Sequence, residues 1–254
     1  MELPSSVTLC EVGLRDGLQN EKVILSTTDK LELLRGVIDA GFHVVEVGAF
    51  SYPRLPQLAD TDRVFRRLGR VSGVELHALA FDLRGTERAI ACGCRKVKLG
   101  VTASRRRSRN KSPEQSVAAL APAVAAAAAK GVAVSGSISM PFASPWEGRT
   151  PVKTVDAITE AFLRLGVSEI SLTDTPGLAH PTQVKNLCRH LRKKYPTVSW
   201  WLHFHNTRGL ALPNILAAMT SGMTRFDTAF GGLGGCPFVP GAAGNVATED
   251  VIHM

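Results

Sequence analysis

Two histidines separated by one residue, His203 and His205, are the first groups in the chain that could do chemistry together. They lie in the apolar run Trp201–Asn206, and in a β-strand residues i and i+2 point to the same side. An extended backbone would therefore direct both imidazoles toward one point, where two neutral imidazoles can bind a divalent metal ion. The simpler alternative is a buried strand with two structural histidines, and an isolated His-x-His pair favours that alternative.

The elements that must position these histidines form a regular alternation. Eight apolar segments of strand length alternate with helical patterns, at residues 7–12, 44–50, 74–81, 96–101, 132–140, 168–173, 198–205 and 225–230. Strand–helix alternation predicts a parallel sheet with helices outside it. Eight repeats favour a closed (β/α)₈ TIM barrel, formed as a single catalytic domain over residues 1–254. An open doubly wound sheet is the alternative.

The sequence also predicts the structure of several segments that connect the strands. Residues 13–21 and 141–151 are predicted as loops, and the Ala-rich helix from Ser112 to Lys130 is predicted to kink at Pro122. The eighth helix begins at Ala247 and the chain stops at Met254. A closed barrel needs a helix over its last and first strands, so we expect the C-terminal helices to be missing, with truncation within or before the last helix.

Composition restricts the class of protein. Thirty Lys and Arg against 22 Asp and Glu give a formal charge of +8, and the 44% apolar fraction is ordinary for a globular protein. The five cysteines are scattered, which favours a reducing, cytoplasmic location. The apolar runs are too short to span a membrane. The basic segment 105–111 lacks interleaved aromatic residues, so we expect a solvated surface and no nucleic-acid partner.

Polar residues gather where the predicted strands end. In a TIM barrel the carboxyl ends of all strands share one rim, and active sites lie there. The candidates are Arg15, Asp16, Glu46, Asp174, His203, His205, Cys236 and Asn245. Imidazole, carboxylate and amide groups suit Mg²⁺ or Mn²⁺, with Zn²⁺, Fe²⁺ or Co²⁺ as alternatives. Four such ligands would leave about two of six positions for substrate oxygens, and the fixed charge of Arg15 suits an enolate or carboxylate oxygen.

Three motifs carry a specific resemblance. They are residues 13–21 (GLRDGLQNE), the His203-Phe204-His205 strand, and the pair of segments 232–237 (GLGGCP) and 244–250 (GNVATED). In this order, and over essentially the whole chain, they resemble the 3-hydroxy-3-methylglutaryl-CoA lyase family, whose members are metal-dependent TIM-barrel enzymes. The Gly-Gly-Cys-Pro loop favours the lyases over the related isopropylmalate and homocitrate synthases.

The resemblance implies cleavage of 3-hydroxy-3-methylglutaryl-CoA, or a close 3-hydroxyacyl-CoA, to acetyl-CoA and acetoacetate. It implies a divalent cofactor, Mg²⁺ or Mn²⁺, and CoA as part of the substrate. It also implies a homodimer if the C-terminal helices are present. The residues that match the family fall into three roles: metal ligands Asp16, His203, His205 and Asn245; catalytic residues Arg15, Asp16, Glu46, His203 and Cys236, with Cys236 in a mobile loop that closes over the substrate; and Lys22 near the CoA phosphates.

The sequence also departs from the family pattern. Asn206, Arg208 and Leu210 stand where Asp, Tyr and Gln are usual, so a different 3-hydroxyacyl-CoA is an alternative substrate. Two further hypotheses remain at this stage. One is a condensing synthase that consumes acetyl-CoA, and the other is a truncated barrel that binds acyl-CoA without turnover.

Overall fold

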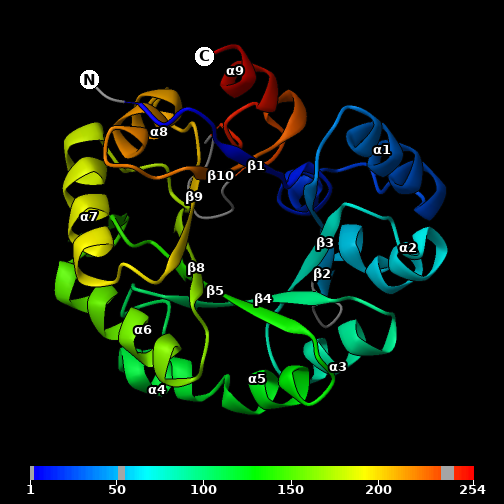
Figure 1. Ribbon diagram of the computed structural model, residues 1–254, viewed down its shortest axis with the longest axis horizontal. Helices are drawn as coiled ribbons and strands as arrows, with labels where there is room; N and C mark the ends of the chain where they lie inside the picture. Colours follow the sequence, from blue (N-terminus) through cyan, green and yellow to red (C-terminus); the bar gives the residue numbers. More distant parts are fainter. Residues whose placement is uncertain (1–2, 51–54, 236–242) are drawn as a thin grey trace.

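The chain forms a closed barrel of eight parallel strands with helices outside it (Figure 1). The computed structural model describes residues 3–50, 55–235 and 243–254. The barrel order is β1-β10-β9-β8-β5-β4-β3-β2, and β1 closes the ring by pairing with both β10 and β2. The strands are β1 (Thr8–Glu11), β2 (Val44–Phe50), β3 (Glu75–Ala80), β4 (Lys96–Thr102), β5 (Ala133–Ser139), β8 (Glu169–Asp174), β9 (Ser199–Phe204) and β10 (Arg225–Thr228). The closed barrel predicted from the sequence is confirmed, and the open sheet is excluded.

Helices follow the strands as the periodicity predicts. They are α1 (Thr27–Asp39), α2 (Thr61–Leu68), α3 (Leu83–Ala91), α4 (Pro113–Ala118), α5 (Ala121–Ala128), α6 (Val152–Arg164), α7 (Pro181–Lys194), α8 (Ala211–Met219) and α9 (Thr248–His253). Ser26 caps α1 by accepting from the backbone N–H of Asp29, whose carboxylate accepts from the N–H of Ser26. Such a capping box satisfies two donors that a helix start would otherwise leave unpaired.

The connecting segments differ from expectation in three places. The segment predicted as a loop after β1 is a π-helical turn, Gly13–Gly17, followed by a 3₁₀ turn, Leu18–Asn20. The Ala-rich segment is two helices, α4 and α5, and Pro122 lies in the first turn of α5, where its missing N–H is not needed. The segment 141–151 contains two short antiparallel strands, β6 (Ala143–Ser144) and β7 (Gly148–Arg149).

The two faces of the barrel strands have opposite chemistry. On β4, Val97 and Leu99 belong to the apolar layer between sheet and helices, whereas Lys96 and Lys98 carry ion pairs with residues of other strands. This alternation follows from the period of two along a strand. Buried polar side chains therefore fill much of the barrel interior, and burying charges is tolerated only where each finds a partner.

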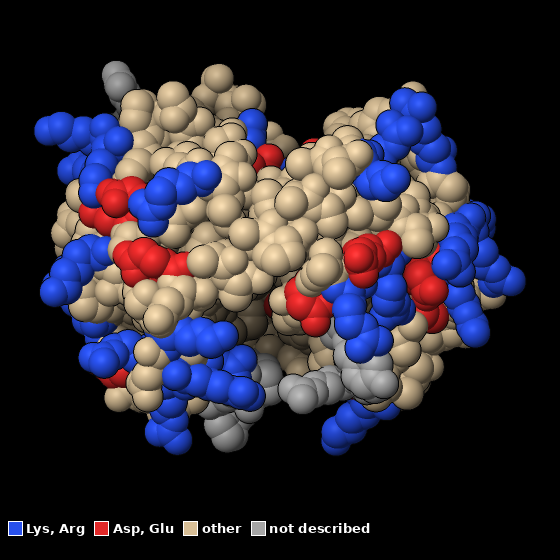
Figure 2. Space-filling model, turned by 90° about the horizontal axis from the view of Figure 1, so that it is seen from below, with Lys and Arg blue, Asp and Glu red and all other residues tan. Residues whose placement is uncertain are grey.

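The outer surface carries the excess positive charge. The arginines of the segment 105–111 are exposed, as are Arg189, Arg192, Lys193 and Lys194 of α7. Figure 2 shows Lys and Arg in several separate groups on one side of the molecule, with Asp and Glu between them. Within the described ranges, no helix has the length and apolar character needed to cross a bilayer.

Packing between β2 and α2 makes Gly48 a sensitive position. A Cβ at Gly48 would lie 2.4 Å from Oγ1 of Thr61. That hydroxyl cannot move away freely because it donates to the carbonyl of Leu58 (2.8 Å) and accepts from the N–H of Ala49 (3.3 Å). We expect Gly48→Ala to lower the free energy of unfolding by about 1–3 kcal/mol, measured by chemical denaturation.

Gly36 supplies the matched control for Gly48. It lies exposed in α1, and a Cβ there meets nothing within 4 Å. Gly36→Ala should raise the free energy of unfolding by about 0.5–1 kcal/mol, because alanine loses less conformational entropy in a helix. Equal effects of the two substitutions would contradict the packing assigned to Gly48.

Candidate metal-binding active site

A buried cluster of Asp16, His203 and His205 lies where strands β1 and β9 end. His203 is in β9, His205 directly follows it, and Asp16 lies in the π-helical turn after β1. Their ligand atoms all lie within 4.8 Å of one another, although 187 positions separate Asp16 from His203 in the chain. The predicted convergence of the two imidazoles is therefore confirmed.

The spacing of these atoms fits a single octahedral ion. Nε2 of His205 lies 3.0 Å from Nε2 of His203 and 3.2 Å from Oδ2 of Asp16, and Nε2 of His203 lies 3.6 Å from the same oxygen. Adjacent ligands of an octahedral ion at about 2.1 Å are themselves about 3 Å apart. The donor set, two imidazole nitrogens and a carboxylate oxygen, is one that divalent first-row metals and Mg²⁺ accept. Geometry and chemistry thus both fit the predicted ion.

Asn245 reaches the same cluster from the segment before α9. Its Nδ2 donates to Oδ2 of Asp16 (3.0 Å) and to the carbonyl of Leu233 (2.9 Å), and its backbone pairs with that of His205. The structure thus brings all four predicted ligands together. The amide nitrogen of Asn245 is the atom that faces Asp16, so coordination through its oxygen stays a prediction.

The two histidines are electrostatically different. Burial alone would lower the pKa of His203, but Asp16 and Asp227 accept from its ring and raise that pKa to about 9. Burial lowers the pKa of His205. The two carboxylates thus favour the protonated form of the His203 ring, whereas burial favours the neutral form of His205.

Arg15 and Glu46 form an ion pair at the side of the cluster. Nε of Arg15 lies 3.0 Å from Oε1 of Glu46, and its Nη1 contacts Oδ1 of Asp16. The Arg15 side chain keeps 16% of its surface exposed, whereas the side chains of its two carboxylate partners are buried. The salt bridge to Glu46 therefore fixes the guanidinium of Arg15 beside the cluster of Asp16, His203 and His205.

Three further side chains in contact with the site escaped sequence reasoning. Gln19 donates to Oδ1 of Asp16 (2.8 Å). Asp227 of β10 accepts from Nδ1 of His203 (3.2 Å), and Lys98 of β4 contacts both Asp227 and Glu46. Asp227 and Lys98 are charged residues inside predicted strands, and this sequence signal could have pointed to both.

The other predicted residues have different outcomes. Both carboxylate oxygens of Asp174 accept from backbone N–H groups, those of Leu178 (3.1 Å) and Ala179 (3.0 Å), so this residue orders the turn after β8. Lys22 is exposed in the segment that precedes α1. Cys236 lies outside the described residues, so its predicted role stays untested.

The three family-pattern departures lie just past the histidines. Oδ1 of Asn206 accepts from the N–H of Ala211 (3.2 Å), which ties it to the start of α8. Arg208 is exposed on the connecting turn, and Leu210 is the residue that precedes α8. These positions therefore shape the rim beside His205 and do not replace a ligand.

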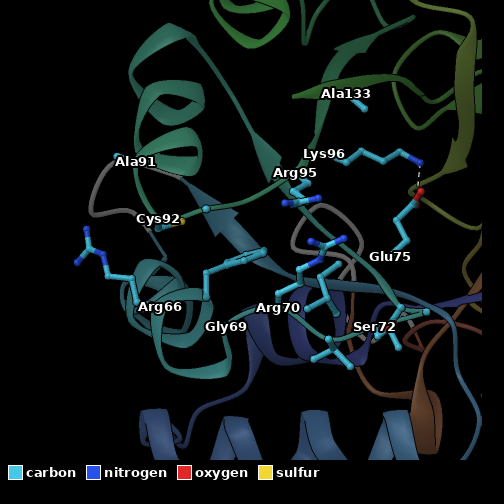
Figure 3. Close-up of a pocket in the computed structure, with 16 residues that line it drawn as sticks. Arg66, Gly69, Arg70, Ser72, Glu75, Ala91, Cys92, Arg95, Lys96 and Ala133 are labelled. Atoms are coloured by element: carbon cyan, nitrogen blue, oxygen red, sulfur yellow. Dashed lines mark hydrogen bonds and ion pairs between the residues drawn. The ribbon is translucent and has the colours of Figure 1, made fainter. Parts of the chain in front are cut away.

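A cavity of about 850 Å³ lies elsewhere, at the amino ends of the strands. It is lined by the segments 69–76 and 91–96, which precede β3 and β4, together with Phe65, Arg66 and Ala133. Figure 3 shows its arginines and the ion pair between Lys96 and Glu75 (2.8 Å). None of the predicted site residues lines it. The converging polar groups lie at the other end of the strands, where TIM-barrel active sites are found.

Fold and site together define a (β/α)₈-barrel enzyme with a buried two-histidine, one-aspartate centre. The family model described as HMGL-like matches residues 6–254. The chain belongs to this family.

Relatives and a solved structure agree with that assignment. The chain is 38% identical to a hydroxymethylglutaryl-CoA lyase of Bacillus subtilis, over 100% of this chain and 86% of the relative. It is 36% identical to an (R)-citramalyl-CoA lyase of Chloroflexus aurantiacus, over 98% and 83% of the two chains. A solved HMG-CoA lyase of Acinetobacter baumannii, in complex with coenzyme A and 3-methylmalate, superposes with a TM-score of 0.92 at 37% identity, over 98% of this chain and 83% of that one.

The cluster geometry predicts how metal binding responds to mutation. His205→Ala should abolish stoichiometric Mn²⁺ binding, measured by titration calorimetry, because it removes the imidazole that contacts both other ligands. His190 of α7 provides the control, since it pairs with Asp156 on the outer layer (2.9 Å). Retention of one Mn²⁺ per chain in His205→Ala would show that the ligand assignment is wrong.

Glu11 ties the segments around the site together. Its Oε1 accepts from the N–H groups of Gly13 (2.6 Å) and Phe230 (3.1 Å), and its Oε2 accepts from Oγ1 of Thr248 (2.6 Å). Burial raises the pKa of Glu11 to about 7, more than these hydrogen bonds lower it. The folded state thus disfavours the carboxylate relative to the unfolded chain.

This pKa predicts a pH dependence of stability. The contribution of Glu11 is fully present below pH 4.5 and is lost as the pH rises through 7, at a cost of about 3 kcal/mol. Glu11→Gln keeps an oxygen acceptor and should flatten this part of the profile, measured by urea denaturation at pH 5 and pH 8. Glu32→Gln, an exposed change in α1, should leave the wild-type slope. An unchanged slope in Glu11→Gln would contradict the assignment.

Proposed function

We propose that this enzyme cleaves 3-hydroxy-3-methylglutaryl-CoA to acetyl-CoA and acetoacetate with the help of a divalent ion. The observation that carries the proposal is the meeting of Asp16, His203, His205 and Asn245 beside Arg15 at the carboxyl ends of the strands. The relatives reported above are named as lyases, which supports cleavage over condensation. The presence of every proposed ligand argues against a barrel that only binds acyl-CoA.

The four ligand residues would hold Mg²⁺ or Mn²⁺. When bound, such an ion lowers the pKa of a coordinated hydroxyl and stabilises developing negative charge. Oδ1 of Asp16 is engaged by Arg15 and Gln19, which leaves Oδ2 directed at the histidines. These contacts orient the carboxylate before any ligand arrives, so little reorganisation is needed on binding.

The reaction needs one bond to break and two protons to move. The C3 hydroxyl of the substrate loses its proton, the C2–C3 bond breaks, and C3 becomes the ketone of acetoacetate. The electron pair of that bond passes to the enolate of acetyl-CoA, which is protonated at C2. We assign Arg15 to the enolate oxygen, because Glu46 holds its partly buried guanidinium beside the metal-binding residues, and His203 to proton transfer.

The remaining assignments complete the proposal. We assign Lys22 to the CoA phosphates and Cys236 to a loop that closes over the substrate. We place the protein in the cytoplasm as one catalytic domain, which forms a homodimer if the C-terminal helices are present. The four described cysteines are buried and unbridged, as a reducing location would allow. Because one relative is a citramalyl-CoA lyase and the rim departs at Arg208 and Leu210, the acyl group is the least constrained part of the proposal.

A product assay tests the activity. Wild-type protein with Mg²⁺ and 3-hydroxy-3-methylglutaryl-CoA should release acetoacetate, and EDTA should stop it. Arg15→Met should lower kcat/KM by about 10²–10³-fold, because one fixed positive charge at the developing oxyanion is lost. (R)-Citramalyl-CoA in a parallel assay decides between the two acyl groups.

Two outcomes would contradict the proposal. Release of acetoacetate that EDTA does not affect would exclude a metal-dependent reaction. Consumption of acetyl-CoA with a 2-oxo acid, without carbon–carbon cleavage of either acyl-CoA, would assign the protein to the condensing enzymes.

A further inference from the structure

Lys98 is a cation buried in the barrel interior, beneath the candidate site. It lies on β4, its residue is 9% exposed, and its Nζ contacts Oε2 of Glu46 (2.5 Å) and Oδ2 of Asp227 (3.3 Å). In the barrel order β4 stands four strands from β10, so Lys98 reaches across the interior to Asp227. It thus joins two carboxylates that come from separate walls of the barrel.

Each of these carboxylates holds one side chain of the candidate site. Glu46 uses Oε2 for Lys98 and His77, and presents Oε1 to Nε of Arg15 (3.0 Å). Asp227 lies beside His203 in the β9–β10 register and accepts from its Nδ1 (3.2 Å). A histidine whose Nδ1–H is bound by a carboxylate keeps Nε2 directed at a metal.

The charges explain why a lysine is needed there. Glu46 and Asp227 repel one another, and each raises the cost of the other's negative charge. Burial alone would lower the pKa of Lys98, but Asp227 and Glu46 together raise it above its ordinary value. Without this ammonium, two buried carboxylates would face each other with less compensation, and one would have to move or take up a proton.

We propose that Lys98 is a positioning residue, which fixes His203 through Asp227 and Arg15 through Glu46. The proposal rests on the proposed function for its kinetic part only. Lys98 makes no contact with the metal cluster among the described residues, so it acts on metal and substrate through the two carboxylates.

Lys96 provides a matched control on the same strand. It is two residues earlier, points to the same side, and is also buried and paired with two carboxylates, Glu75 (2.8 Å) and Glu169 (2.6 Å). Those glutamates are partly exposed and contact neither His203 nor Arg15. Lys96→Met therefore removes a comparable ion pair without touching the candidate site.

The experiment compares Lys98→Met with Lys96→Met in the chain of 254 residues. For Lys98→Met we expect Mn²⁺ affinity, measured by calorimetry, to fall about 10-fold and kcat to fall about 10–100-fold. KM for the acyl-CoA should change less than about threefold, because Lys98 lies below the rim. Lys96→Met should keep Mn²⁺ affinity and kcat within about twofold of wild type, even if its melting temperature falls.

A double variant tests the route of the effect. Asp227→Asn keeps an oxygen that can accept from Nδ1 of His203. It also removes the negative charge that Lys98→Met would leave uncompensated. Lys98→Met with Asp227→Asn should therefore bind Mn²⁺ and turn over better than Lys98→Met alone. It also serves if the single variant does not fold, which circular dichroism would show.

The outcomes separate this proposal from the proposed function. If Lys98→Met matches Lys96→Met in both Mn²⁺ affinity and kcat, Lys98 has no positioning role. Asp227→Asn is measured alone as well. If the loss of Mn²⁺ affinity and kcat in the double variant equals the sum of the losses in Lys98→Met and Asp227→Asn, Lys98 does not act through Asp227. If the wild-type protein cleaves neither 3-hydroxy-3-methylglutaryl-CoA nor (R)-citramalyl-CoA, the proposed function fails. The comparison of Mn²⁺ affinities still decides the role of Lys98.

Discussion

The structure depends on pairing the charged side chains that are buried around the candidate site, among the residues that the structure describes. Moving an ionised group out of water costs several kcal/mol unless a partner compensates it. Here the compensation is continuous. Asp16 meets Arg15 and the histidines, Glu46 meets Arg15 and Lys98, and Asp227 meets Lys98 and His203. This network offsets the free-energy cost of burying the charges, and it also fixes the orientation of the side chains that face the rim. Stability and function therefore depend on the same contacts.

The need to pair buried charges also explains why alternate residues along each strand differ in polarity. Alternate residues facing the helices are apolar and supply the stabilising layer, as Val97 and Leu99 do on β4. The intervening positions are free to carry polar groups because the barrel holds them in fixed registers, such as Asp227 beside His203. A rigid barrel thus positions a site whose residues come from loops and strands far apart in the sequence, as Asp16 and His205 show.

Local patterns predicted much of this correctly. The alternation of strands and helices follows from hydrophobic periodicity over a few residues, so the closed barrel could be predicted without tertiary information. The His-x-His spacing and the motifs around Asp16 and Asn245 carried the four candidate ligands for the same reason. Backbone details such as the π-helical turn at Gly13–Gly17 were not predicted, because this turn lies against distant segments, as the contacts of Asp16 with His205 and Asn245 show.

By itself the sequence determined the barrel, the family resemblance and the residue types of a candidate metal centre. Only the tertiary structure decided which charges meet. In the sequence, Lys98 is simply a charged residue within a predicted strand. It can pair with Asp227 only because β4 lies across the closed barrel from β10. The partnership of Asp227 with His203 likewise follows from strand register, which a linear pattern does not specify. Side-chain period is a local property of the chain, whereas charge pairing across a barrel is a property of its closed geometry.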